Sequence, residues 1–207
     1  MQVARVSNGK ALDEELIQRI ASHIQSQLQL KNDESLLDVC CGNGLLLSCL
    51  KPHCREATGI DFSEALIGQA IEKYSAEQLQ FLHLDATQFN LKKKFDKVLL
   101  YFSFQYFESY ETGKLVIENL LKHAKPGALI LIGDIPDKSR WFQYYNSFSK
   151  WLTYTKQYYR NANDMGKFWH EKELLSICDE LGVKGEKQVQ ESWQPYSHYR
   201  FDFRIQC

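Results

Sequence analysis

The sequence has no long apolar run and almost no excess of charge of either sign. None of its apolar stretches approaches the roughly 20 residues that a membrane-spanning helix needs, so we expect no membrane span. Lys and Arg number 25 and Asp and Glu number 26, which leaves a net charge of −1. Such a balance argues against bulk electrostatic capture of nucleic acid. The N-terminal residues contain no apolar core typical of a secretory signal, and we expect a cytoplasmic protein.

Cysteine patterns typical of disulfide frameworks or metal knuckles are also absent. The six cysteines include the adjacent Cys40 and Cys41, a poor disulfide pair, and no C-x-x-C spacing occurs. We therefore expect free thiols and no metal site. Aromatic residues, by contrast, are plentiful: 12 Phe, 11 Tyr and 4 Trp are far more than a disordered chain carries. A chain of 207 residues predicts a single domain over residues 1–207.

Short apolar runs alternate with amphipathic stretches, a pattern typical of an α/β protein with a parallel sheet. Apolar residues four apart predict an N-terminal helix within residues 1–30. The predicted strands are 35–40, 56–60, 80–84, 95–102 and 128–132, with helices at 45–50, 63–74 and 112–123 and a turn at 125–127. Residues 136–170 interrupt the alternation, and a helix at 171–180 and antiparallel strands at 183–190 and 199–205 complete the chain. The pattern predicts a Rossmann-like, doubly wound, mostly parallel sheet with a C-terminal antiparallel hairpin.

Glycines and acids follow the predicted strands, where ligands bind on such sheets. The Gly42–Gly44 turn ends the first strand and opens a helix, so the backbone can turn sharply and present free N–H groups. Asp61 and Asp85 end the next two strands. Two cofactor classes fit this pattern: dinucleotides and S-adenosylmethionine. Leu47 stands where the dinucleotide fingerprint has its third glycine, which counts against NAD.

Five segments, in order, resemble the motifs of the class I S-adenosylmethionine-dependent methyltransferases. The resemblance covers about residues 30–135 and implies S-adenosylmethionine as the cofactor and S-adenosylhomocysteine as the product. The segments are Leu36–Gly44, Gly59–Ser63, Leu84–Ala86, Phe95–Val98 and Leu121–Ala128.

This resemblance also implies roles for residues at the strand ends. Asp38 would hold the Gly42–Gly44 turn and reach the methionine amino group. Asp61 would accept the ribose hydroxyls, Phe62 would lie against adenine, and Asp85 would accept from the adenine amine. The other residues implied at the cofactor are Cys40, Gly42 and Gly44 along the methionine and ribose, Ala86 at an adenine ring nitrogen, and Tyr101, Phe102 and Gln105 at the methionine end.

Residues 136–170 hold an aromatic insert with two interpretations. Between Trp141 and Trp169 lie 11 of the 27 aromatic residues, which could pack on the sheet edge. Alternatively, they form a helical lid over the transferring methyl group, where closure would exclude water. The insert is also basic, which favours an anionic acceptor: it contains Lys150, Lys156, Arg160 and Lys167 against Asp164.

The catalytic candidates are His170 and Tyr106, because an alcohol acceptor benefits from a general base. The alternative for His170 is a helix N-terminal residue without chemistry. His198 in the hairpin loop is a further candidate, and the remaining histidines are expected at surface or helix positions. Tyr101–Phe104 lacks the Pro-Pro motif of the methyltransferases that act on nucleic-acid bases, so we expect no nucleic-acid partner. We expect a small polar acceptor, methylated on an oxygen of a sugar or an activated metabolite.

Two other interpretations of the sequence stay open. One is an oxidoreductase with a nucleotide cofactor. The other is a non-catalytic, methyltransferase-like domain that binds a partner protein, or a second copy as a homodimer, through the aromatic insert.

Overall fold

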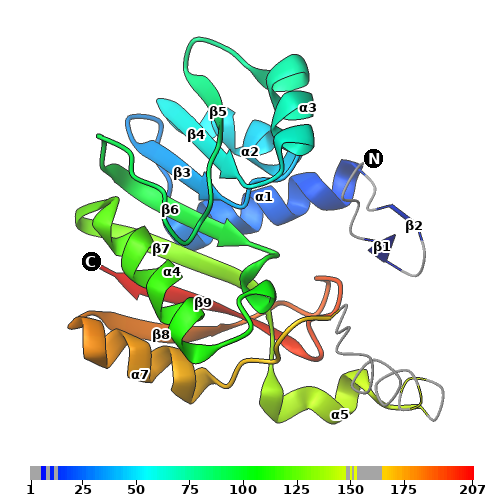
Figure 1. The fold of residues 1–207 in the computed structure, drawn as a ribbon. Helices are drawn as coiled ribbons and strands as arrows, with labels where there is room; N and C mark the ends of the chain where they lie inside the picture. Colours follow the sequence, from blue (N-terminus) through cyan, green and yellow to red (C-terminus); the bar gives the residue numbers. More distant parts are fainter. Residues whose placement is uncertain (1–5, 8–9, 12–13, 148–149, 151, 153–164) are drawn as a thin grey trace.

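The computed structural model describes residues 6–7, 10–11, 14–147, 150, 152 and 165–207 (Figure 1). The central parallel strands are buried on both faces, as their apolar runs require. The strands are β1 Val6–Ser7, β2 Lys10–Ala11, β3 Ser35–Val39, β4 Glu56–Asp61, β5 Leu79–His83, β6 Phe95–Tyr101, β7 Ala124–Pro136, β8 Lys184–Val189 and β9 Arg200–Gln206. The helices are α1 Glu14–Leu28, α2 Leu45–Leu50, α3 Glu64–Tyr74, α4 Tyr110–Lys122, α5 Trp141–Tyr144 and α7 Glu171–Leu181, with 3-10 turns η1 Lys51–His53, η2 Phe104–Tyr106 and η3 Lys138–Arg140.

Seven strands form one sheet in the order β5-β4-β3-β6-β7-β9-β8, and β1 and β2 form a separate pair. The strands from β5 to β7 are mutually parallel, whereas β9 runs antiparallel to both β7 and β8. The chain reverses its direction of winding at β3, which has β4 on one side and β6 on the other. The predicted doubly wound sheet with a terminal antiparallel hairpin is confirmed, and its ligand crevice is expected at the carboxyl ends of β3 and β6.

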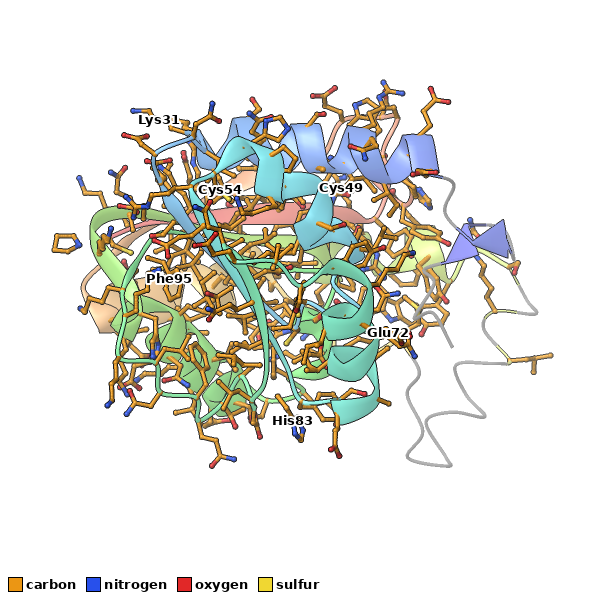
Figure 2. The ribbon with its side chains drawn as sticks, turned by 90° about the horizontal axis from the view of Figure 1, so that it is seen from above. Lys31, Cys49, Cys54, Glu72, His83 and Phe95 are labelled. Carbon is orange, nitrogen blue, oxygen red and sulfur yellow. The ribbon has the colours of Figure 1, made fainter. Side chains whose placement is uncertain are left out.

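Helices cover both faces of the sheet (Figure 1). Successive side chains of a strand point to opposite faces, so Leu36 packs in the core with α1, α2 and α3, whereas Leu37 packs with α4 and α7. Figure 2, seen from above, shows α1 and α2 lying over their side of the sheet. The carboxyl ends of the parallel strands point toward the side where α5 and the β1–β2 pair lie (Figure 1).

The turn predicted at residues 125–127 is wrong. These residues belong to β7, where they form an irregularity: Ala124 pairs with Phe95 and Leu129 pairs with Lys97. Gly127 adopts φ 78°, and its N–H donates to the carbonyl of Cys207 at 3.0 Å. The C-terminal residue Cys207, which follows β9, thus supplies a hydrogen-bond partner that the local sequence Lys-Pro-Gly does not reveal. The segment stays within β7 as an irregularity.

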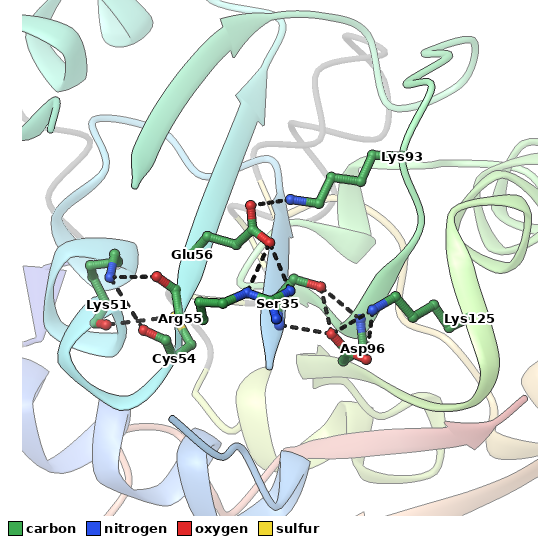
Figure 3. Close-up of polar contacts among 8 residues, drawn as sticks. All are labelled: Ser35, Lys51, Cys54, Arg55, Glu56, Lys93, Asp96 and Lys125. Carbon is green, nitrogen blue, oxygen red and sulfur yellow. Dashed lines mark hydrogen bonds and ion pairs between the residues drawn. The ribbon is translucent and has the colours of Figure 1, made fainter. Parts of the chain in front are cut away.

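Polar side chains connect the amino ends of β3, β4 and β6 (Figure 3). The Asp96 carboxylate accepts hydrogen bonds from Ser35 N at 2.9 Å, Ser35 Oγ at 2.7 Å and Lys125 Nζ at 2.9 Å, and Lys93 pairs with Glu56. Burial alone would raise the pKa of Asp96, but the hydrogen bonds from Lys125 and Ser35 outweigh it and lower this pKa to about 2. This cluster stabilises the edge of the sheet opposite the ligand crevice.

Asp96→Asn should lower the free energy of unfolding at neutral pH by about 1–3 kcal/mol, because it removes charge-assisted hydrogen bonds. A lowered folded-state pKa stabilises the fold above the unfolded value and is lost as the pH falls through the folded value. The difference from the wild type should therefore shrink as the pH falls from 3.8 toward about 2. Urea unfolding at a series of pH values measures it, with the exposed Asp33→Asn as the control. A difference that stays constant with pH would contradict this account.

Candidate functional site

The carboxyl ends of three neighbouring strands carry residues with left-handed backbone conformations. Cys40 follows β3 with φ 63°, Phe102 follows β6 with φ 73°, and Asp134 lies near the end of β7 with φ 61°. This conformation is costly for residues other than glycine, and it concentrates at ligand-binding and catalytic sites. Because β3, β6 and β7 are adjacent in the sheet, these three strained residues lie along one edge of it. We place the candidate site at this edge.

The glycine turn after β3 needs both of its glycines. Gly42 and Gly44 have φ values of 58° and 76°, which favour glycine. A Cβ atom at Gly44 would lie 2.6 Å from the Phe81 ring, whereas a Cβ at Gly42 would meet nothing within 4 Å. Gly44 therefore lets α2 pack closely on the sheet, and the open space beside Gly42 lets a ligand approach the backbone.

The carboxylate of Asp61 holds this turn. Its Oδ2 accepts from the N–H of Gly42 at 2.9 Å, and its Oδ1 accepts from the N–H of Ser63 at 2.9 Å. Asp61 is the last residue of β4 and is almost fully buried. The resemblance assigned the support of the glycine turn to Asp38, but the structure gives this hydrogen bond to Asp61. Each carboxylate oxygen keeps a further lone pair that could accept a ligand hydroxyl.

Asp38 and Cys40 lie beside Asp61 in a buried acidic environment. Burial first and the Asp61 carboxylate second raise the pKa of Asp38 well above its usual range. Burial also raises the pKa of Cys40, with the Asp61, Asp38 and Asp85 carboxylates adding to the effect. The Cys40 thiol thus stays protonated and is a poor nucleophile. A cationic ligand group would relieve the mutual repulsion of these acids.

A hollow of about 470 Å³ lies at the ends of β4 and β5, and Phe62 and Asp85 are among its lining residues. The Phe62 ring is 73% exposed. Asp85 Oδ1 accepts from the N–H and the hydroxyl of Thr87, both at 2.8 Å, and the Thr87 backbone N–H is the main cause of the lowered pKa of Asp85. His83, labelled in Figure 2, also lines the hollow, and its Nε2 lies 2.7 Å from the Phe62 carbonyl oxygen.

The hollow fits an adenine-like group. An exposed aromatic ring can stack on a planar heterocycle, and an ionised carboxylate can accept from its exocyclic amine. Ala86 follows Asp85 directly and is buried, and its carbonyl accepts from Asn119 Nδ2 at 3.2 Å. The structure thus brings Asp61, Phe62 and Asp85 to one side of the glycine turn, as the sequence predicted.

The residues implied at the methionine end follow β6. Tyr101 donates through its hydroxyl to Asp202 Oδ2 at 3.3 Å, and its ring covers Gly133, where a Cβ would lie 1.9 Å away. The buried Gln105 donates through Nε2 to the Phe102 carbonyl at 2.8 Å. Its Oε1 has no hydrogen-bond partner among the described residues. A buried orphan acceptor next to a cofactor edge is a position where a ligand donor would be favourable.

The structure gives His170 a role in capping a helix. Its Nδ1 accepts from the Lys172 N–H at 3.1 Å, and its own N–H donates to Glu173 Oε2 at 2.8 Å, a capping box at the start of α7. This is the alternative that the sequence left open for His170. Tyr106 ends η2 with an exposed side chain. No contact within the described residues tests either one as a catalytic base, and both assignments stay predictions.

The described part of the aromatic insert divides between core and surface. Trp169 is fully buried against Gly113 and Phe104, whereas Phe142 of α5 is 78% exposed. Lys167 forms an ion pair with Glu173 at 2.7 Å, so its charge is engaged within the protein. Several aromatic and charged residues of the insert lie outside the described residues: Phe148, Trp151, Tyr154, Lys156, Tyr158, Tyr159, Arg160 and Asp164.

Sequence reasoning missed a buried polar network on β7 and β9. Asp202 accepts from the Asp134 N–H at 2.8 Å and from Gln190 Nε2 at 2.7 Å, and His23 Nε2 lies 3.3 Å from its Oδ2. Arg200 donates to Asp134 Oδ2 at 2.7 Å. His23, expected at a surface or helix position, lies in α1 on its apolar stripe and is buried. The spacing of His23 relative to the apolar residues of α1 was the sequence signal that could have predicted its burial.

His123, also expected at a surface or helix position, is the buried C-cap of α4. Its Nε2 accepts from the Leu91 N–H at 2.9 Å, and its Nδ1 lies 2.8 Å from the Asn119 carbonyl. His123 therefore connects the β5–β6 connection to α4 and has a structural role.

Within the described ranges, no three His, Cys, Asp or Glu side chains group closely enough to hold a metal ion. The six cysteines, all within those ranges, are free thiols, as predicted. No helix in the described part of the chain is both long and apolar enough to cross a membrane.

The strand order and the glycine–acid edge define a Rossmann-like methyltransferase, and comparison with known proteins identifies the family. The family model described as a methyltransferase domain matches residues 12–188. The chain therefore belongs to this family of methyltransferase domains. The predicted membership of the class I S-adenosylmethionine-dependent methyltransferases is confirmed.

Curated relatives and solved structures agree with this family. Malonyl-(acyl-carrier protein) O-methyltransferase of Priestia megaterium is 23% identical over 176 residues, which are 84% of this chain and 61% of that protein. A dTDP-4-amino-2,3,4,6-tetradeoxy-D-glucose N,N-dimethyltransferase of Saccharopolyspora spinosa is 29% identical over 114 residues, 53% of this chain and 45% of that protein. The chain thus spans about half to three fifths of these relatives' lengths.

Among solved structures, the fold is similar to that of N-methyltransferase NodS from Bradyrhizobium japonicum in complex with S-adenosylhomocysteine. The TM-score is 0.65 at 18% identity, covering 94% of this chain and 88% of that chain. At this identity the likeness confirms the fold, with its mostly parallel sheet and antiparallel hairpin.

Proposed function

We propose that the protein transfers the methyl group of S-adenosylmethionine to a small polar acceptor, on an oxygen of a sugar or an activated metabolite. The observation that carries the cofactor assignment is the hollow at the ends of β4 and β5, which both the exposed Phe62 and the ionised Asp85 line. When bound, the cofactor supplies a methyl group made electrophilic by the sulfonium charge.

The residues along this edge of the sheet would each bind a different part of the cofactor. Asp61 would accept the ribose hydroxyls with the lone pairs that the Gly42 and Ser63 N–H groups leave free. Phe62 would stack on the adenine, and Asp85 would accept from its amine. The orphan Oε1 of Gln105 would accept from the methionine ammonium. Catalysis would then come largely from alignment of the acceptor with the methyl group in line with its bond to sulfur.

The acceptor assignment is supported by chemistry rather than by a bound molecule. The Saccharopolyspora spinosa relative is named as an N,N-dimethyltransferase of a nucleotide-linked amino sugar, which supports a sugar as the acceptor. The Priestia megaterium relative is named as an O-methyltransferase, which supports oxygen as the methylated atom. An aromatic insert next to the strand ends could cover such a compound as a lid. The anionic acceptor favoured by the basic insert has less support, because Lys167 is already paired with Glu173. His170 and Tyr106 remain the proposed candidates for a base, and a homodimer remains a prediction.

Two alternatives differ in what they predict for ligand binding. A nucleotide-dependent oxidoreductase should bind NAD, and it is disfavoured by Leu47 at the third glycine position and by the family match. A non-catalytic domain should bind a partner through the insert and leave the crevice without ligand affinity.

Calorimetric titration separates these functions. The purified protein should bind S-adenosylhomocysteine with a Kd of roughly micromolar order, about 8 kcal/mol of binding free energy, and should not bind NAD. Binding of NAD alone would favour the oxidoreductase. A folded protein that binds neither ligand would contradict the proposed function and favour the partner-binding domain.

A further inference from the structure

The hollow at the ends of β4 and β5 has walls that come from two different strands. Phe62 directly follows Asp61, the last residue of β4, and Asp85 lies two residues after His83, the last residue of β5. Both Phe62 and Asp85 line the hollow. A ligand that stacks on Phe62 and donates to Asp85 therefore requires a fixed spacing between the ends of β4 and β5.

The Asp85 carboxylate is held by the segment that directly follows it. Its Oδ1 accepts from the N–H and the hydroxyl of Thr87, both at 2.8 Å, and Gln88 Nε2 donates to its Oδ2 at 3.4 Å. All of these donors come from residues close to Asp85 in sequence. The position of this carboxylate thus depends on the segment after β5 and not on β4.

The Phe62 ring, by contrast, is not fixed by packing, because it is 73% exposed. Its position over the hollow has to be set by its own backbone. The neighbouring backbone is held on both sides: the Asp61 carbonyl accepts from the Leu84 N–H at 3.0 Å, and the Ser63 N–H donates to Asp61 Oδ1 at 2.9 Å. Phe62 itself is contacted by His83, whose Nε2 lies 2.7 Å from the Phe62 carbonyl oxygen.

The partner of His83 determines which of its ring nitrogens carries a proton. A carbonyl oxygen only accepts hydrogen bonds, so Nε2 of His83 must be the donor. A donor on a rigid ring limits how far the peptide between Phe62 and Ser63 can rotate. His83 pairs with Asp61 in the parallel register of β4 and β5, so its own backbone is fixed by the sheet.

We propose that His83 is a positioning residue for the adenine of the cofactor. It belongs to the strand that leads to Asp85, and it donates to the residue that would stack on the adenine. His83 therefore sets the spacing between the Phe62 ring and the Asp85 carboxylate without contacting the cofactor itself. The inference rests on the proposed function, which places the adenine in this hollow.

The first test compares two variants of His83 by calorimetry. His83→Leu removes the donor and should raise the Kd of S-adenosylhomocysteine by about 3- to 10-fold, as expected for one lost hydrogen bond. The Kd of adenosine should rise by the same factor, because the effect lies in the adenine half of the ligand. His83→Gln keeps an N–H donor of similar reach and should bind both ligands with nearly wild-type affinity.

The matched control is His53→Leu, because His53 ends η1, which precedes the amino end of β4. It should leave both affinities unchanged. Wild-type affinity in His83→Leu, equal weakening in His83→Leu and His83→Gln, or weakening for S-adenosylhomocysteine but not for adenosine would overturn the proposal. A folded wild-type protein that binds neither ligand would instead contradict the proposed function.

A double-mutant cycle with Phe62→Ala tests whether His83 acts through Phe62. Once the ring is absent, His83→Leu should change the Kd of S-adenosylhomocysteine by less than about twofold, because no stacking group remains to be placed. The same 3- to 10-fold loss of affinity in the Phe62→Ala background, about the value of one hydrogen bond, would show that the two residues act independently and would overturn the proposal.

Nitrogen NMR of the His83 ring provides a test that needs no ligand. In alkaline solution, where imidazole rings are neutral, His83 should carry its proton on Nε2. A proton on Nδ1 would leave Nε2 unable to donate to the Phe62 carbonyl, and this result would also overturn the proposal.

Discussion

Replacing Asp61 by alanine should weaken the binding of S-adenosylhomocysteine by about 10- to 150-fold, which corresponds to about 1.5–3 kcal/mol. Two losses combine in this result. The ribose hydroxyls lose a charged acceptor, and the N–H groups of Gly42 and Ser63 lose the carboxylate that fixes the turn at 2.9 Å from each. Calorimetry with the variant and the wild type measures the ratio of the two Kd values.

The control for this prediction is Asp96→Asn. Asp96 also lies on a parallel strand and accepts several hydrogen bonds, but it sits at the amino end of β6, on the opposite edge of the sheet. Asp96→Asn should therefore change stability and leave the affinity for S-adenosylhomocysteine unchanged. An Asp61→Ala protein that is folded by circular dichroism and binds with wild-type affinity would refute the placement of the ribose at Asp61.

Trp169→Ala should lower the free energy of unfolding by about 3–5 kcal/mol, the range for removing a fully buried aromatic side chain. The Trp169 ring packs so closely on α4 that a Cβ at Gly113 would lie 2.3 Å from it, and its ring centre lies 4.7 Å from that of Phe104. Its indole N–H has no partner in the described structure, which reduces the loss somewhat. Urea unfolding followed by circular dichroism measures the change.

Phe142→Ala is the matched comparison within the same aromatic insert. Phe142 is 78% exposed, so its removal should change the free energy of unfolding by less than about 0.5 kcal/mol. Similar stability losses in both variants would contradict the division of the insert into a buried and an exposed part. If the exposed part covers the acceptor, Phe142→Ala should instead raise the KM for the acceptor once one is known.

The sequence determined the features that depend on local periodicity and on residue type. Short continuous apolar runs, separated by amphipathic stretches, specified the parallel strands, because strands that are buried on both faces need continuous apolar runs. The strand-end positions of Gly42, Asp61 and Asp85 also indicated the edge of the sheet where we propose that the cofactor binds. The N-cap position of Ser63, whose Oγ accepts from the Leu66 N–H at 3.4 Å, was equally readable from residue type.

Features that depend on distant partners were decided only by the tertiary structure. Residues 125–127 stay in β7, where the Gly127 N–H has its hydrogen-bond partner in Cys207, about 80 residues away along the chain. The polar partner of His23 is likewise remote, because Asp202 lies 179 residues away along the chain. Neither partner can be identified from the residues that neighbour these segments in the sequence.

The difference between local pattern and distant partners also applies to the candidate site. The sequence by itself determined the family and the sheet, because both depend on motifs and apolar runs whose residues are close together along the chain. Only the tertiary structure decided that Asp61 rather than Asp38 holds the glycine turn and that His170 caps α7. It also decided that His83 at the end of β5 reaches the Phe62 carbonyl after β4. Hydrogen-bond partners and burial are set by the packing of segments remote in sequence, and residue types alone do not encode which atoms remain unpaired.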